Sequence, residues 1–272
     1  MPGIKKELTQ LNTFAKKSYG QNFLSNKSKI DKIAEEILNN STNDIIEIGP
    51  GLGAITEPLV NQKRNIICIE KDKVLIENLK NKFKLKKNIT LINEDVLKID
   101  FKSISSENSI IVGNLPYNIS TKILIKFVNE LHENTNKGIF MFQREVADKI
   151  IAKKIKKNQL SSKIKIFYEV KEILKVNEND FWPPPKIKSS VLLFTPKKIS
   201  SNNLNMKELD KFLQCAFFSN RKKIVNNLAN KYDKDRIFSI LKKLRINDKV
   251  RPEDIDEGML LQIFIMINNN KF

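Results

Sequence analysis

The sequence predicts an α/β fold with a Rossmann-like sheet, followed by a small all-helical C-terminal domain. Short apolar runs alternate with helical or polar segments between residues 44 and 142. A glycine-rich turn, residues 49–53, follows the first of these runs directly, and beyond residue 205 the chain has helical periods but no strand-like run. Alternating strands and helices predict a mainly parallel sheet covered by helices, and the later change of pattern predicts a second domain.

The first amphipathic element lies in "SKIDKIAEEILNN", residues 28–40. Its apolar side chains recur at the spacing of one helix face, at Ile30, Ile33, Ala34, Ile37 and Leu38. Ser25 or Ser28 is available as the N-cap, because a serine hydroxyl can accept from a free backbone N–H of the first turn. We therefore expect a helix that packs against the sheet.

Five short apolar runs predict the strands of the sheet, at 44–48, 65–69, 89–92, 109–113 and 138–142. They are rich in isoleucine and valine without polar alternation, which is typical of parallel strands buried on both faces. A last strand is expected in "SSVLLFTP", residues 189–196, after the prolines of "FWPPPK". The segment "LSSKIKIFYEV", residues 160–170, fits a helix and a strand, and we favour the helix.

The predicted domain boundary lies in the polar segment "KKISSNNLN". Residues 1–197 would form the Rossmann-like domain with a basic N-terminal arm, and 198–272 the helical domain. Helical periods in that second part occupy 206–218, 221–229, 235–244 and 254–267.

Composition favours a polyanionic partner and excludes several other classes. Lys+Arg 49 against Asp+Glu 31 gives a formal charge of +18, although the abundance of Lys, Asn and Ile is also what an A/T-biased genome produces. Cys68 and Cys215 lie in apolar patterns and are expected to be buried thiols without a disulfide. The single histidine, His132, is expected at the surface, so neither a metal site nor a histidine triad is predicted.

Nothing in the sequence predicts a membrane span or a secretory leader. No run approaches the roughly 20 apolar residues that cross a bilayer. The N-terminus is basic but has no apolar core segment or cleavage site. The expected compartment is the cytoplasm.

The glycine-rich turn is the first part of a predicted cofactor site. Gly49 and Gly51 allow the backbone a tight turn and a close approach to a ligand, although a turn that only packs is the alternative. Glu70 ends the second strand, where a carboxylate could accept from both ribose hydroxyls; alone, it could also be a solvated acid. Asp95 and Val96 follow the third strand and could contact an adenine ring, or Asp95 could cap a turn. These positions do not separate NAD from S-adenosylmethionine.

The segment Asn114-Leu115-Pro116-Tyr117 after the fourth strand carries the strongest chemical signal. An exocyclic amine of adenine is a poor nucleophile because its lone pair is delocalised into the ring. The side-chain carbonyl of Asn114 and a backbone carbonyl at Leu115 or Pro116 could accept its two hydrogens and align the nitrogen for in-line attack on a methyl group. No strong general base is needed, since the nitrogen becomes acidic as the new bond forms.

Two aromatic residues could hold the target base. Tyr117 offers a face for stacking, and Phe181, fixed by the prolines after it, could close the other face. The alternatives are a tyrosine at a helix start and a phenylalanine that plugs the edge of the core.

On these motifs the chain resembles the KsgA-type small-subunit (16S) rRNA adenine N6,N6-dimethyltransferases. "KKSYGQNFL" (16–24) resembles the N-terminal cofactor lid of that family, "EIGPGLGAIT" its glycine loop and "NLPYNIS" its catalytic loop. "MFQREVADKI", "FWPPPKIKSSV" and "FFSNRKKIVNNL" match later signatures. Asn158-Gln159-Leu160-Ser161 stands where the family usually has Gly-Arg-Leu-Ser, Lys153–Lys157 replaces a more mixed loop, and Tyr19 stands where a smaller apolar residue is common.

The resemblance implies a class I S-adenosylmethionine-dependent methyltransferase. It implies that the cofactor contacts Asn22, Leu24, Gly49, Gly51, Glu70, Asp95, Val96 and Asn114. It also implies that the target adenine lies among Asn114, Leu115, Pro116, Tyr117 and Phe181.

The implied substrate is a pair of adjacent adenosines in the loop of the 3'-terminal helix of 16S rRNA, within an immature small ribosomal subunit. Arg221-Lys222-Lys223 and the basic C-terminal region would face the RNA, unless they form an ordinary solvated helix face. We expect a monomer, since no helix has a long exposed apolar stripe. Rival interpretations are a large-subunit enzyme of the macrolide-resistance type, against which Leu115 argues, a non-catalytic RNA-binding or transcription factor on the same fold, and an NAD-dependent oxidoreductase.

Overall fold

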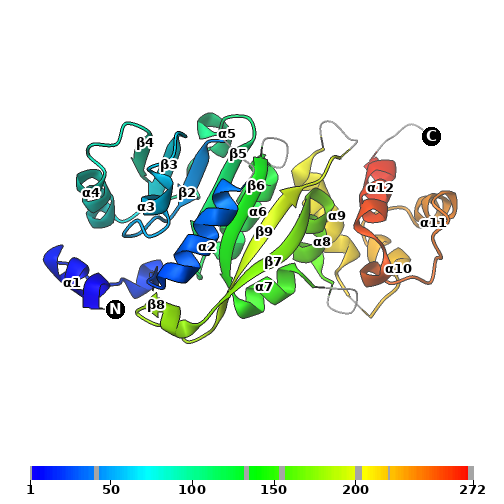
Figure 1. The fold of residues 1–272 in the computed structure, drawn as a ribbon. Coiled ribbons are helices and arrows are strands. Elements are labelled where there is room, and N and C mark those ends of the chain that lie inside the picture. Colours follow the sequence, from blue (N-terminus) through cyan, green and yellow to red (C-terminus); the bar gives the residue numbers. More distant parts are fainter. Residues whose placement is uncertain are drawn as a thin grey trace. The chain divides into compact units, whose positions relative to one another are not determined.

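The computed structural model describes residues 2–39, 43–131, 135–152, 157–199, 204–219 and 221–268 (Figure 1). Contacts group the chain into two compact units, Met1–Ala147 with Val170–Pro196, and Asp148–Glu169 with Lys197–Phe272. The segment 148–169 is thus grouped with the second unit, whereas the sequence-based division assigned it to the first. The division at residue 197 stays a prediction.

Seven strands of the described chain form one sheet, in the order β4-β3-β2-β5-β6-β9-β7. Their bounds are β2 (Ile45–Ile48), β3 (Ile66–Glu70), β4 (Ile89–Asn93), β5 (Ser109–Asn114), β6 (Thr135–Gln143), β7 (Tyr168–Val176) and β9 (Ser189–Pro196). The first five run parallel, and β9 pairs antiparallel with β6. All six strands predicted from the sequence are confirmed.

The centre of the sheet is buried on both faces, as its isoleucine-rich strands require. Every residue of β2 is buried, and so are the first five of β5. Beside β6 and β9, edge-to-face rings fill the space under α6 (Ser120–Leu131): Phe127, Phe140, Phe142 and Phe194. A two-sided core of this kind explains why the strands show no polar alternation.

Helices follow the parallel strands in the order expected of this fold. They are α2 (Lys27–Leu38), α3 (Thr56–Leu59), α4 (Lys73–Lys82), α5 (Phe101–Ile104), α6 and α7 (Arg144–Ile150). The predicted first helix is confirmed, but its cap is neither of the expected serines. Asn26 caps α2 by accepting from the N–H of Lys29, while the hydroxyl of Ser25 donates to the carbonyl of Asp180.

The N-terminal arm is more ordered than a basic tail. It contains α1 (Pro2–Gln10), a 3-10 turn (Lys17–Tyr19) and β1 (Phe23–Leu24). β1 pairs antiparallel with β8 (Phe181–Trp182), the short strand that precedes the prolines. Leu8 of α1 is buried in a small apolar cluster with Phe23, Leu52 and Leu75.

The ambiguous segment at 160–170 holds a helix and the start of a strand. α8 (Gln159–Phe167) begins with a capping box between Asn158 and Ser161, and β7 starts at the next residue, Tyr168. The helix interpretation is correct up to Phe167 and wrong beyond it, and the sequence did not predict β7. Residues 153–156 of the lysine-rich loop lie outside the described residues, as does His132.

The second unit is helical after residue 204, as predicted. Its helices are α9 (Met206–Ala216), α10 (Ile224–Leu228), α11 (Lys234–Lys243) and α12 (Glu257–Asn268). Asn227 is fully buried and donates to the carbonyls of Ala216 and Ser219, which fixes α10 against the end of α9. Cys68 and Cys215 are both free cysteines; Cys68 is buried as predicted, whereas Cys215 is only partly buried.

Candidate active site

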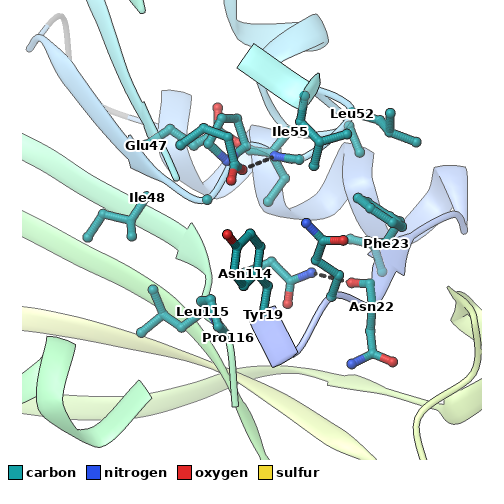
Figure 2. Close-up of a pocket in the computed structure, with 18 of the residues that line it drawn as sticks. Tyr19, Asn22, Phe23, Glu47, Ile48, Leu52, Ile55, Asn114, Leu115 and Pro116 are labelled. Carbon is teal, nitrogen blue, oxygen red and sulfur yellow. Dashed lines mark hydrogen bonds between the residues drawn. The ribbon is translucent and has the colours of Figure 1, made fainter. Parts of the chain in front are cut away.

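A cavity of about 760 Å³ lies at the carboxyl ends of β2, β3 and β5, within the first unit. Eleven of the twelve predicted site residues line it: Asn22, Leu24, Gly49, Gly51, Glu70, Asp95, Val96, Asn114, Leu115, Pro116 and Tyr117. Figure 2 shows Glu47 and Ile48 on one side of the cavity, which we call its floor, Asn22 and Phe23 of the arm on the other side, and Tyr19 between them. The volume is in the range typical of small-molecule sites.

The glycine loop has the backbone conformation that only glycine adopts without strain. Gly49 and Gly51 have φ of +67° and +60°. A Cβ at Gly51 would also lie 3.1 Å from the ring of Phe23, so the arm packs directly on the loop. The absence of side chains at both positions opens the cavity wall to close approach of a ligand.

Two backbone N–H groups fix the carboxylate of Glu70, one at each of its oxygens. Oε2 accepts from the N–H of Gly51 at 3.2 Å and Oε1 from the N–H of Asp72 at 2.9 Å. The side chain is 8% exposed, and burial raises its pKa even though these hydrogen bonds lower it. Each oxygen keeps an acceptor position for hydroxyl groups of a ligand.

Glu47 is a second buried carboxyl that the sequence analysis did not single out. It is 2% exposed, accepts from the hydroxyl of Thr56 at 2.7 Å, and also lines the cavity. Burial raises its pKa from 4.5 to about 7, and the charge of Glu70 adds to this. The signal available in the sequence was an acidic residue inside the apolar run 44–48, where a strand residue should be buried.

The amide of Asn114 is oriented by the N-terminal arm. Its Nδ2 donates to the backbone carbonyl of Asn22 at 2.9 Å, drawn as a dashed line in Figure 2. This hydrogen bond fixes the plane of the amide of Asn114, which lines the cavity. Gly113 allows this position, because a Cβ there would lie 2.7 Å from the carbonyl oxygen of Ile48 and 2.9 Å from Leu115.

Tyr117 is held by a partner that the sequence analysis missed. Its hydroxyl lies 2.7 Å from the hydroxyl of Ser189, at the start of β9. Burial raises the pKa of the phenol. The ring therefore lines the cavity as a fixed wall.

Phe181 is the predicted site residue that the structure does not bring to the cavity. Its side chain is 1% exposed and packs in the main core with Leu24 and Ile33, and it does not line the cavity among the described residues. Phe181 itself pairs with Leu24 of β1. Phe181 therefore packs under β1 of the arm, in the core, and does not face the cavity.

Asp95 lies at the rim of the cavity. One oxygen pairs with Lys71 at 2.8 Å and the other accepts from the N–H of Leu97 at 3.0 Å. The hydrogen bond from Lys71 lowers its pKa, so the group is a carboxylate at neutral pH. The turn cap that was the alternative for Asp95 is thus present, and the contact with a cofactor stays a prediction.

A buried aspartate anchors the arm, again without a signal in the sequence analysis. Asp72 is 2% exposed, caps α4 through Val74, and binds Lys16 at 2.7 Å and Gln21 at 3.1 Å. Burial alone would raise its pKa, but the hydrogen bonds from Lys16 and Gln21 lower it overall. Lys16 also lies 5.4 Å from the ring centre of Tyr19. One carboxylate thus connects the helix cap to the cover of the cavity.

A sequence model described as "Ribosomal RNA adenine dimethylase" matches residues 12–269. The chain belongs to the ribosomal RNA adenine dimethylase family. Within it, "Ribosomal RNA small subunit methyltransferase A" of Mycoplasma mobile is 41% identical over 258 residues, covering 93% of this chain and 98% of the relative. The protein of the same name from Aliarcobacter butzleri is 40% identical, with coverages of 94% and 97%. As a member of this family, the chain is an rRNA adenine dimethyltransferase.

Solved structures show the same fold. A dimethyladenosine transferase from Plasmodium falciparum superposes with a TM-score of 0.78 at 24% identity, covering 90% of this chain and 97% of that one. The 23S rRNA methyltransferase ErmE gives 0.69 at 22% identity, with coverages of 91% and 100%. The predicted Rossmann-like methyltransferase sheet with a helical C-terminal part is confirmed.

No helix among the described residues is long and apolar enough to cross a membrane. No group of three or more His, Cys, Asp or Glu residues in that part of the chain could hold a metal ion.

Proposed function

We propose that this protein transfers methyl groups from S-adenosylmethionine to the exocyclic amines of two adjacent adenosines in the 3'-terminal helix loop of 16S rRNA. The relatives named above are both small-subunit methyltransferases by name, and they match nearly the whole chain. The products would be dimethyladenosines, formed during biogenesis of the small subunit in the cytoplasm, with the enzyme acting as a monomer.

The cavity fits an adenosine-containing cofactor. Glu70 offers two carboxylate oxygens to ribose hydroxyls, and the Gly49 and Gly51 wall leaves room for the chain of the ligand. Asp95 and Val96 would contact the adenine, with Asn22 and Leu24 covering it from the arm. When bound, S-adenosylmethionine supplies an electrophilic methyl group.

The Asn114 loop would activate the target amine. The Asn114 carbonyl accepts one amine hydrogen. The carbonyl of Pro116 already accepts the N–H of Ile119 at 3.1 Å, which favours the Leu115 carbonyl as the second acceptor. Two acceptors draw the nitrogen toward a tetrahedral geometry and align its lone pair with the transferred group. The nitrogen then releases a proton to solvent.

Tyr117 would stack on the target base, a contact that contributes roughly 1–3 kcal/mol in single-stranded nucleic acid complexes. Ser189 holds the ring in place. A matching contact from Phe181 would require its ring to leave the core, so we assign Phe181 to the support of β1. Arg221, Lys222 and Lys223 would contact phosphates of the substrate.

The observation that carries this proposal is the fixed amide of Asn114. The test measures transfer of labelled methyl groups from S-adenosylmethionine to small subunits that lack the modification. We expect dimethyladenosine with the wild type and loss of at least 100-fold in rate with Asn114→Ala, on the order reported for removing one preorganised group. Asn81→Ala, an exposed asparagine of α4, is the matched control. Label only in naked large-subunit RNA would select the macrolide-resistance type instead, and no label in either would leave a binding factor.

A further inference from the structure

A second cavity of about 490 Å³ lies at the amino ends of β2, β3 and β4 of the same sheet. It is lined by residues that precede β2, β3 and β4, together with the end of the α3 turn: Asp44, Val60, Asn61, Gln62, Lys63, Arg64, Asn65, Lys86, Lys87 and Asn88. The candidate active site lies at the carboxyl ends of these strands and the second cavity at their amino ends, with Asn61 after α3 lining both. Neither the proposed chemistry nor the cofactor uses this second cavity.

The lining of this cavity is strongly cationic. Lys63, Arg64, Lys86 and Lys87 contribute four positive charges, and Asp44 is the only carboxylate among the described lining residues. Asp44 is engaged within the protein. Its Oδ1 accepts from the side chain of Asn65 at 3.2 Å, and its Oδ2 accepts from the hydroxyl of Ser106. The cavity therefore presents excess positive charge to a ligand.

The frame that carries these cations is fixed by Asn88. Its Nδ2 lies 3.2, 3.0 and 2.9 Å from the carbonyl oxygens of Val60, Gln62 and Arg64. Lys86 donates to the side chain of Asn61 at 2.7 Å and so connects the two loops across the cavity. A rigid frame reduces the entropy lost when the exposed cations bind an anion.

Another basic side chain lies near the cavity, because the charge of Arg64, after burial, contributes to lowering the pKa of Lys137. Leu85, next to Lys86, is 85% exposed but does not line the cavity.

We propose that this cavity binds phosphates of the RNA backbone, as a second contact of the substrate at the amino ends of the strands, away from the chemistry. The inference rests on the proposed function only for the identity of the RNA. Contacts of this kind hold and orient the substrate without reading its sequence. They also imply that the bound RNA is larger than one loop, since it must reach both ends of the strands.

Salt dependence provides the test. Each neutralised phosphate contributes about −0.9 to the slope of log affinity against log salt in duplexes and about −0.7 in single strands. In Lys63→Ala/Lys87→Ala both substituted side chains are exposed. We expect the slope for binding to small subunits to fall in magnitude by about 1.4–1.8. Between about 50 and 200 mM salt, the wild type should then lose about tenfold more affinity than the double variant.

The matched control is Lys32→Ala/Lys175→Ala, two exposed lysines that line neither this cavity nor the candidate active site. Affinity for S-adenosylmethionine and the transfer rate at saturating subunits should be unchanged in both double variants. A slope equal to that of the wild type in Lys63→Ala/Lys87→Ala would overturn the proposal. The proposal would also be overturned if NMR showed saturable binding of inorganic phosphate to this cavity while Lys63→Ala/Lys87→Ala bound small subunits with the affinity of the wild type. Failure of the proposed function would show separately, as a wild type that binds subunits but does not methylate them.

Discussion

Replacing Glu47 by glutamine should make the protein more stable at alkaline pH and leave it nearly unchanged at acidic pH. The carboxyl of Glu47 is buried beside Thr56, and burial raises its pKa from 4.5 to about 7. Glutamine keeps the size and the acceptor for the threonine hydroxyl but cannot ionise. The variant therefore isolates the cost of placing a negative charge at the floor of the cavity.

The magnitude follows from the pKa. One pKa unit corresponds to about 1.4 kcal/mol, so a rise from 4.5 to about 7 corresponds to about 3 kcal/mol. Above the pKa of the unfolded state, the unfolded chain releases the proton while the folded chain retains it. The stability contributed by this carboxyl consequently falls between about pH 4.5 and about pH 7 and is constant above that.

Urea unfolding of the ligand-free protein between about pH 5 and about pH 8.5 measures this effect. The difference in free energy of unfolding between Glu47→Gln and the wild type should rise by about 2.5 kcal/mol across that range, because titrating groups that do not interact with Glu47 cancel in the difference. A flat difference for Glu47→Gln would refute the reasoning.

Three further predictions concern the arm and the catalytic loop. Asp72→Asn keeps the helix cap but removes the charge that holds Lys16. A loss of about 1 kcal/mol should appear in calorimetry as about fivefold weaker binding of S-adenosylmethionine. An unchanged affinity would mean that this ion pair does not hold the arm over the cavity. Gly113→Ala places a methyl group 2.7 Å from a backbone oxygen and should lower stability by about 1–3 kcal/mol, and an unchanged melting temperature would contradict the close packing. Tyr117→Phe loses only the hydroxyl held by Ser189 and should slow single-turnover transfer by less than about fivefold, whereas Tyr117→Ala should slow it at least about tenfold; equal losses would argue against stacking.

The parts of the fold that the sequence predicted are those with one periodicity from end to end. The isoleucine runs before Gly49 and before Asn114 read as buried strands, because a parallel sheet buries both faces of each strand. β7 was missed because the helical period of α8 changes to a strand period at Tyr168, without a glycine or proline between them. Asn26 caps α2 in place of Ser25 because the hydroxyl of Ser25 forms a hydrogen bond with the carbonyl of Asp180, which is far away in the sequence.

The sequence likewise predicted some residues of the candidate site and missed others. Residues that follow strand ends, such as Gly49, Glu70 and Asn114, were found because the topology of a parallel sheet brings strand ends together. Asp72 and Ser189 were missed because their roles depend on partners in other segments, Lys16 and Tyr117 respectively. Phe181 was expected at a ligand because prolines follow it, but those prolines do not show which way its ring points.

The pairing of β1 with β8 sets an order of events while the chain is being made. Ser25 and Asn26 bind Asp180, which lies 155 residues beyond Ser25 in the sequence. All five parallel strands are synthesised before that partner exists. These strands and the glycine loop can therefore form first, and the arm acquires its final position only after translation has passed Trp182. A nascent chain shorter than this is expected to have the floor of the cofactor cavity without its cover.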